Sequence, residues 1–162
     1  MRYDPDGGTI ADLPVALRDL GVDVSVLVVT TAGLGTLNTT ALTVEALRTR
    51  RLPLYGLVIG SWPAAPDLAS RCNLTDLPGV ANAPLLGALP ERCAKHDREG
   101  FLPIARASLA PELGGTWSHA AFLAKHAEAS HSLQSAHAVE EAPEHSRHRV
   151  RARGLDRWTE LV

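Results

Sequence analysis

Apolar residues near the start of the chain are spaced as in an amphipathic helix. Three leucines recur at helical spacing and predict a helix over Ala11–Leu20, with Gly21 just past its end. Thr9 and Asp12 are the two candidate N-caps. Pro14 favours Asp12, because the proline then falls in the first helical turn and removes no helical hydrogen bond.

The next apolar segments are short and continuous. Val24–Thr30 is nearly all β-branched or aliphatic, which is typical of a strand buried on both faces of a parallel sheet, and Leu54–Ile59 and Leu85–Leu89 repeat this pattern. Helical spacing in Ala41–Leu47 and in Asp67–Leu77 predicts helices between the strands. Strands that alternate with helices in this way predict an α/β fold with a parallel sheet.

Beyond the third strand the apolar pattern becomes weaker. Phe101–Leu109 and His119–Ala127 predict two short helices. From residue 128 onward Ala, Ser, His and Glu dominate, and the chain ends after the basic run Arg147–Arg153. We therefore expect one α/β domain over residues 1–127 and a disordered or weakly helical tail over 128–162.

Composition narrows the classes of function. The 162 residues are 45% hydrophobic and carry a formal net charge of -2, so no basic field favours a nucleic-acid or anionic-membrane partner. Two cysteines, Cys72 and Cys93, are too few for a disulfide framework and lack the spacing of a zinc site. Without a signal sequence or eighteen consecutive apolar residues, the expected location is the reducing cytoplasm.

The loop Thr31–Thr40 carries the strongest chemical signal. Gly33 and Gly35 permit a tight turn at the carboxyl end of a parallel strand, and the following helix directs its free N–H groups and positive dipole end towards that turn. This arrangement predicts an anion site. The alternative is a plain strand-to-helix connection, with one of Asn38–Thr40 as the helix cap. A dinucleotide site is disfavoured, because Asn38 stands at the third glycine position and no acidic residue follows about twenty residues later.

Several common catalytic motifs are missing from the 162 residues. There is no G-x-x-x-x-G-K-[ST], and Lys95 and Lys125, the two lysines, follow no glycine-rich loop. G-x-S-x-G and H-E-x-x-H are also absent. The histidines from His119 to His148 contain no i, i+4 pair that favours a metal site, and the basic run at 147–153 is typical of a solvated segment.

Two further strand endings are expected beside the Gly33–Asn38 loop. Gly60–Pro63 follows the second strand and Pro90–Arg92 follows the third, and parallel strands end at the same sheet edge. Small residues beside Trp62 suit a flat ring, while a carboxylate and a guanidinium in Pro90–Arg92 suit hydroxyls or phosphates. The alternative is a pair of turns that merely end the strands.

Three segments together resemble a known family. Leu34–Thr43, Gly56–Pro63 and Ala83–Pro90 are similar in order and spacing to the C-terminal half of dethiobiotin synthetase, especially its actinobacterial members, and the resemblance covers Gly8–His126. It implies a Rossmann-like, three-layer P-loop NTPase fold. It also implies an enzyme of biotin synthesis that uses ATP, Mg²⁺ and CO₂ to close a ureido ring on 7,8-diaminopelargonate, through a phosphorylated carbamate.

The resemblance also assigns roles to residues of this sequence. The substrate carboxylate, held across a homodimer interface, would be bound by Gly35, Thr36, Leu37 and Asn38. The nucleotide base and ribose would lie along Gly60, Ser61, Pro90, Glu91 and Arg92. Many relatives have an Asn-Asp pair where this chain has Gly60 and Ser61, which puts strict selectivity for ATP in doubt.

The family's P-loop, catalytic lysine and Mg²⁺-binding acids belong before Met1, so we expect no catalytic or metal-binding residue in this chain. The first hypothesis is a ligase whose phosphate-binding half is encoded upstream or separately, so that this chain alone is inactive. The second is a non-catalytic remnant or dimerising binding module without ligase activity. A third and weaker possibility is another P-loop amide ligase or a partition-type ATPase relative. In each case a missing neighbouring strand would leave Val24–Thr30 with an open edge that invites pairing.

Overall fold

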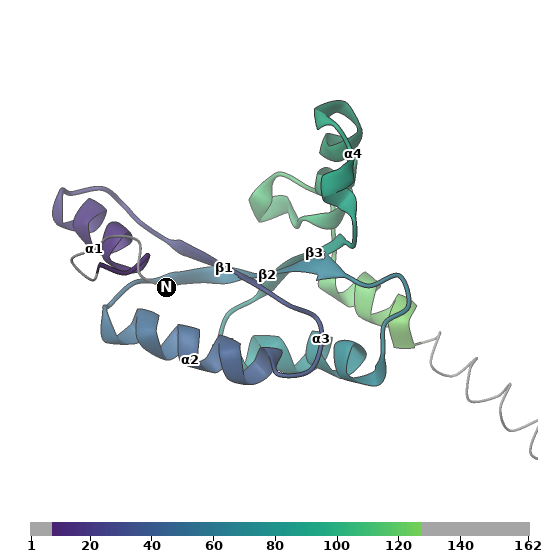
Figure 1. The fold of residues 1–162 in the computed structure, drawn as a ribbon, viewed down its shortest axis with the longest axis horizontal. Helices are drawn as coiled ribbons and strands as arrows, with labels where there is room; N and C mark the ends of the chain where they lie inside the picture. Colours follow the sequence, from purple (N-terminus) through teal and green to yellow (C-terminus); the bar gives the residue numbers. More distant parts are fainter. Residues whose placement is uncertain (1–7, 128–162) are drawn as a thin grey trace, which may run out of the picture.

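The computed structural model describes residues 8–127 and shows strands alternating with helices (Figure 1). The predicted α/β class is confirmed, whereas the predicted tail at 128–162 lies outside the described residues. The elements, in chain order, are α1 (Asp12–Asp19), β1 (Val26–Thr30), α2 (Thr36–Thr49), β2 (Leu54–Trp62), α3 (Leu68–Ala81), β3 (Leu85–Pro90) and α4 (Arg98–Ser108). Short 3₁₀ turns cover Cys93–Lys95 and Pro111–Leu113, and residues 119–127 are helical. None of these helices is long and apolar enough to cross a membrane.

The sheet has the order β1-β2-β3, and both strand pairs are parallel. Thr30 at the end of β1 pairs with Ile59, while Trp62 at the end of β2 pairs with Pro90 of β3. The three carboxyl ends therefore share one edge of the sheet, as the sequence predicts. β2 ends at Trp62 instead of Ile59, so Gly60 and Ser61 belong to the strand and not to the loop that follows it.

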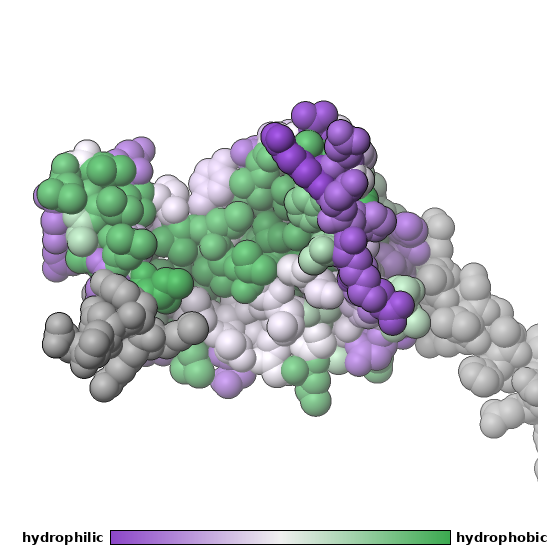
Figure 2. Space-filling view, turned by 45° about the horizontal axis from the view of Figure 1, so that its top comes forward, coloured by the Kyte–Doolittle hydropathy of each residue, from purple (hydrophilic) through white to green (hydrophobic). Residues whose placement is uncertain are grey.

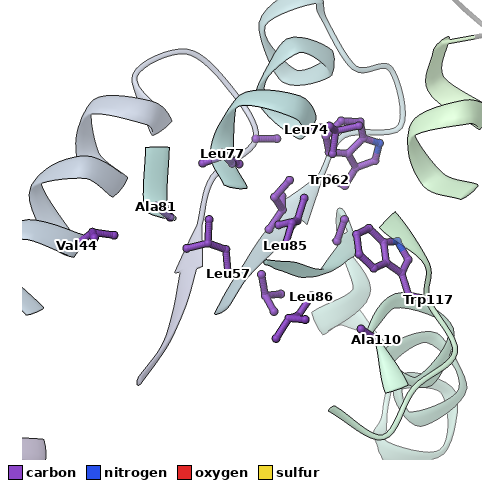
Figure 3. Close-up of a cluster of buried hydrophobic side chains, with 14 residues drawn as sticks. Val44, Leu57, Trp62, Leu74, Leu77, Ala81, Leu85, Leu86, Ala110 and Trp117 are labelled. Carbon is purple, nitrogen blue, oxygen red and sulfur yellow. The ribbon is translucent and has the colours of Figure 1, made fainter. Parts of the chain in front are cut away.

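Helices lie on both faces of the sheet but cover them unequally. α2 and α3 pack side by side along one face, and α4 stands on the other face beside β3 (Figure 1). A cluster of buried side chains packs between the sheet and α2 and α3 and extends past β3 to Leu86, Ala110 and Trp117 (Figure 3). Leu57, Ile59 and Leu77 are fully buried at its centre.

β1 differs from its prediction. The aliphatic run predicts burial on both faces, but Leu27 is 38% exposed and Val29 is 67% exposed. β1 lies at the edge of the described sheet, and α4, the described helix on that face, stands beside β3 at the opposite edge. Apolar composition shows that a strand is suited to burial, but it does not supply the neighbour that buries it.

α1 also begins differently from its prediction. Its N-cap is Ala11, which has no side-chain capping bond, and Asp12 is the first helical residue. The Asp12 carboxylate accepts hydrogen bonds from the Thr9 N–H at 2.6 Å and the Thr9 hydroxyl at 2.8 Å. These bonds lower the pKa of Asp12. The two cap candidates therefore act as a pair that fixes the entry to α1.

Candidate functional site at the carboxyl edge of the sheet

The turn after β1 leads directly into the first turn of α2. Gly35 is the N-cap and adopts a left-handed conformation with φ of 89°, which favours glycine. α2 begins at Thr36, so the cap within Asn38–Thr40 that the alternative interpretation offered is wrong. The physical reason is that the glycine conformation ends the turn early, and the Thr36 N–H is already hydrogen-bonded to the Gly33 carbonyl at 3.3 Å.

Among residues 8–127, two backbone donors in the first turn of α2 have no acceptor. The first hydrogen bond within α2 runs from the Thr39 N–H to the Gly35 carbonyl at 3.1 Å. The N–H groups of Leu37 and Asn38 lie before it, where an α-helix provides no acceptor. Gly35 and Asn38 are exposed, whereas Leu37 is half-buried. The positive end of α2 therefore presents donors at the sheet edge, which is the arrangement that binds carboxylate or phosphate.

A network of threonine hydroxyls holds α2 against the end of β1. The Thr30 hydroxyl lies 2.6 Å from the Thr36 hydroxyl and 3.0 Å from that of Thr40, and Thr36 donates to the Thr31 carbonyl at 2.8 Å. Thr36 and Thr40 are each only 2% exposed. The Thr36 side chain thus fixes the helix start, and because its N–H is bonded to the Gly33 carbonyl, Thr36 positions the turn instead of donating to a ligand.

Asn73 of α3 holds the same turn from the other side. Its side-chain amide donates to the Ala32 carbonyl at 2.7 Å and to the Gly33 carbonyl at 3.0 Å. Asn73 is 6% exposed and Ala32 is 5% exposed, so these bonds satisfy polar groups that water does not reach freely. The turn before α2 is therefore anchored at both of its ends.

A second feature at this edge is a cleft of about 580 Å³ beyond the ends of β2 and β3. Its walls include Trp62, Pro90, Glu91, Arg92, Trp117, Phe122, Lys125 and His126. The Glu91 N–H donates to the Trp62 carbonyl at 2.8 Å and ties the two strand ends together. Arg92 has a left-handed backbone with φ of 63°, which turns the chain sharply away from β3.

Aromatic rings close one side of this cleft. The Trp62 ring lies 5.3 Å from the Phe122 ring and 5.0 Å from the His126 ring, and Phe122 also lies 5.5 Å from Trp117. Trp62 and Trp117 are buried, and their indole N–H groups have no hydrogen-bond partner within residues 8–127. Burial, with the nearby charges of Lys125 and Arg71, lowers the pKa of His126.

The predicted site residues fall into two places. Gly35, Thr36, Leu37 and Asn38 meet at the start of α2, and Pro90, Glu91 and Arg92 line the cleft. Gly60 and Ser61 are not among the residues that line the cleft. Gly60 lies against Val29 on the open face of the sheet, where a Cβ would lie 2.7 Å from the Val29 Cγ1, and Ser61 is exposed.

Sequence reasoning missed Asn73 as an anchor and missed Trp117, Phe122 and His126 as walls of the cleft. Asn73 carries a weak signal, because it is an amide within the apolar positions of a predicted helix and needs partners once it is buried. The aromatic residues carry no local signal, because the cleft forms only when residues 117–126 fold back over β2 and β3.

The fit to a metal ion can be tested on the described residues. Between residues 8 and 127 no three His, Cys, Asp or Glu side chains gather where they could hold an ion. Mg²⁺ requires several oxygen ligands, so these residues do not form such a site by themselves, and we derive no step through a metal. The histidines of the tail prediction beyond His126 lie outside the described residues.

Comparison with known proteins identifies relatives of this chain. A family model described as "AAA domain" matches residues 16–95, which run from α1 to the 3₁₀ turn after β3. The chain is 61% identical over 118 residues to the ATP-dependent dethiobiotin synthetase of Saccharopolyspora erythraea, a match that covers 73% of this chain and 50% of that protein. It is 55% identical over 126 residues to the synthetases of Streptomyces coelicolor and Frankia casuarinae, with 78% of this chain and 51% of each protein covered.

The chain thus spans about half the length of the curated relatives it matches. On this evidence the chain is a homologue of the actinobacterial dethiobiotin synthetases.

Proposed function

We propose that this chain supplies the substrate-carboxylate side and the nucleotide-base side of a dethiobiotin synthetase-type ligase. The reaction would be the ATP-dependent closure of 7,8-diaminopelargonate and CO₂ to dethiobiotin, in the cytoplasm. Support comes from the names of the relatives and from the two features at the sheet edge, the start of α2 and the aromatic cleft.

The observation that carries the proposal is the pair of free N–H groups at Leu37 and Asn38. A carboxylate placed there accepts two charge-assisted hydrogen bonds and meets the positive end of a 14-residue helix. Each such bond contributes about 1.5–3 kcal/mol when it is made to a charged group. The long apolar chain of 7,8-diaminopelargonate ends in a carboxylate of this kind, which suits the site.

The cleft suits a nucleotide base more than it suits a triphosphate. Aromatic and apolar side chains form most of its lining, and the charged Glu91 and Arg92 that also line it can meet ribose hydroxyls or charged groups. The sequence has no Walker-type loop to hold the phosphates. We therefore propose that this chain contacts ATP through the base and ribose, and that groups outside residues 8–127 bind its phosphates and Mg²⁺.

A homodimer is part of the proposal, because in the resembling family the carboxylate lies across the dimer interface. Leu34 at the tip of the turn is 93% exposed, and Leu42 on α2 is 59% exposed. Large apolar side chains beside a ligand-binding helix start are suited to contact with a second subunit.

Calorimetric titration of the purified chain with 7,8-diaminopelargonate and with its methyl ester tests the carboxylate site. We expect the acid to bind at least tenfold more tightly than the ester, because the ester carries no charge. Loss of one charge-assisted hydrogen bond lowers the affinity about tenfold. Equal affinity for the acid and the ester would contradict the proposal.

A pair of variants at Asn38 separates the backbone from the side chain. Asn38→Pro removes the free N–H at the third position of α2, a place that Pro14 already occupies in α1 without disrupting that helix. Asn38→Ala removes the side chain and keeps the N–H. The proposal predicts that Asn38→Pro lowers affinity for the acid about tenfold or more, while Asn38→Ala lowers it less.

The alternative function is a binding module without ligase activity. It predicts the same preference for the acid, but no dethiobiotin when the chain is combined with the phosphate-binding half of a relative. Production of dethiobiotin in that mixture, measured by mass spectrometry, would exclude the alternative.

A further inference from the structure

Two buried polar groups without a partner occur together in the cleft beyond β2 and β3. Within residues 8–127, three buried side-chain nitrogen atoms have no hydrogen-bond partner, namely Nε1 of Trp62, Nε1 of Trp117 and Nε of Arg71. Both indoles belong to the walls of the cleft, whereas Arg71 is not among its lining residues. Trp62 is 6% exposed and Trp117 is 7% exposed. Buried donors are normally paired, so two unpaired donors in one cleft point to a ligand that pairs them.

The open face of the sheet is a different kind of surface. Figure 2 shows hydrophobic residues that run across it from α1 towards the base of α4. Leu27 and Val29 are exposed there, and their side chains carry no hydrogen-bonding group. Apolar contact is non-directional and does not distinguish one ligand from another. The cleft can make that distinction, because it combines rings with donors.

Two aromatic side chains of residues 119–127 pack on these indoles. The Phe122 ring lies edge-on to Trp62 with ring centres 5.3 Å apart, and it lies 5.5 Å from Trp117. His126 lies 5.0 Å from the Trp62 ring. Figure 3 shows both indole nitrogens on the side of their rings that faces away from the labelled leucines. Phe122 thus contacts both indoles while being only half-buried itself.

The chemistry of the walls defines the class of ligand. An indole N–H is a donor and cannot accept, so the two groups require acceptors on the ligand. Aromatic walls favour a flat ring that stacks on them. Nucleobases meet both conditions, because each has a flat aromatic face and ring nitrogen or carbonyl acceptors at its edge.

We propose that the indole N–H groups of Trp62 and Trp117 are the donors that recognise the base in this cleft, and that the Phe122 ring turns aside to admit it. This inference rests on the proposed function, which places a nucleotide base in the cleft, and it adds the residues that select that base. Burial has already removed both donors from bulk water, so pairing them costs little further desolvation of the protein. Loss of one of these bonds should therefore weaken binding at least fivefold.

The first test is a ¹H–¹⁵N NMR titration of the full chain with adenosine. The chain has three tryptophans, and the variants Trp62→Phe and Trp117→Phe assign the indole N–H signals of the two in the cleft. We expect both signals to move downfield as adenosine binds, because each N–H gains an acceptor. If both signals stay in place up to the highest soluble concentration of adenosine, the inference is overturned.

The second test changes the ligand, so that its first comparison needs no variant to fold. In 1-, 3- and 7-deazaadenosine one ring nitrogen of the base is replaced by C–H, which removes one acceptor. At least one analogue should bind the unaltered chain at least fivefold more weakly than adenosine. The same analogue and adenosine should bind equally to Trp62→Phe or to Trp117→Phe, since that variant keeps an aromatic ring and lacks the donor.

Tyr55→Phe is the matched control. It also removes a polar hydrogen from an aromatic side chain, but Tyr55 is 44% exposed and lies near the start of β2, whereas Trp62 ends that strand. The control variant should keep the preference for adenosine over the analogue. Three analogues that all bind as adenosine does, or a preference that persists in both tryptophan variants, would overturn the inference.

These experiments fail separately from the proposed function. If the chain prefers the acid over the ester but the indole signals do not respond to adenosine, the inference about the donors is wrong and the carboxylate site stands. If the indole signals and the analogues behave as expected but the acid and the ester bind equally, the inference stands and the proposed carboxylate site is wrong.

Discussion

Replacing Asn73 with alanine tests whether α3 holds the turn before the candidate anion site. The substitution removes two hydrogen bonds, to the carbonyls of Ala32 and Gly33 at 2.7 and 3.0 Å. Each contributes about 0.5–1.5 kcal/mol, and leaving the buried Ala32 carbonyl without a partner adds about 1–3 kcal/mol. We expect the free energy of unfolding to fall by about 2–6 kcal/mol.

Urea denaturation followed by circular dichroism measures this change, provided that the slope with denaturant stays constant. Cys72→Ala is the control, because Cys72 precedes Asn73 on the same helix and is exposed. The control should shift stability by less than about 0.5 kcal/mol. If Asn73→Ala also lowers the free energy of unfolding by less than about 0.5 kcal/mol, the Asn73 amide does not hold the turn. The argument that the site is preorganised is then refuted.

Three further predictions concern single residues. Gly35→Ala should lower the free energy of unfolding by about 1–2 kcal/mol, because a φ of 89° is unfavourable for a residue with a side chain. The control Gly33→Ala should leave the free energy of unfolding nearly unchanged in the same urea assay, since the added Cβ would meet nothing within 4 Å. Because the pKa of His126 is lowered in the folded chain, the folded chain binds fewer protons than the unfolded chain, and its stability should fall as the pH drops below about 6.5. His126→Gln should make the melting temperature depend less on pH in thermal melts recorded across this range. An unchanged pH dependence in the variant would contradict this prediction. Asp67 caps α3 through the Ser70 N–H at 2.7 Å, and hydrogen bonds from the Ser70 side chain and N–H lower the pKa of Asp67. Asp67→Ala should therefore destabilise the chain at pH 7 more than at pH 3, whereas the exposed Asp76→Ala should not.

A sequence pattern predicts structure well when only one kind of fold satisfies it. Continuous aliphatic runs separated by helical spacing lead to a parallel sheet, and a parallel sheet brings its carboxyl ends together. The sequence therefore places the loop at Gly35 and the turn at Glu91 at one edge of the sheet, where the structure has them. Helix boundaries were less accurate, because Gly35 caps α2 through its backbone and leaves no side-chain signal.

The parts that could not be predicted depend on contacts between distant residues. Asn73 reaches a carbonyl 41 residues earlier in the chain, and Phe122 reaches Trp62 across 60 residues. The exposure of Val29 depends on which strand and helix lie beside β1, and the residues of β1 do not contain that information. Local patterns thus predict the elements and the edge, while the anchors and the cleft require the folded chain.

The central claim is that the backbone at the start of α2 binds the substrate carboxylate. The most direct measurement is a ¹H–¹⁵N NMR titration of the chain with 7,8-diaminopelargonate, with the methyl ester as the matched ligand. The account predicts that the amide signals of Leu37 and Asn38 move most with the acid and little with the ester. Amide signals at Leu37 and Asn38 that stay in place while others move, or that move equally with both ligands, would contradict it.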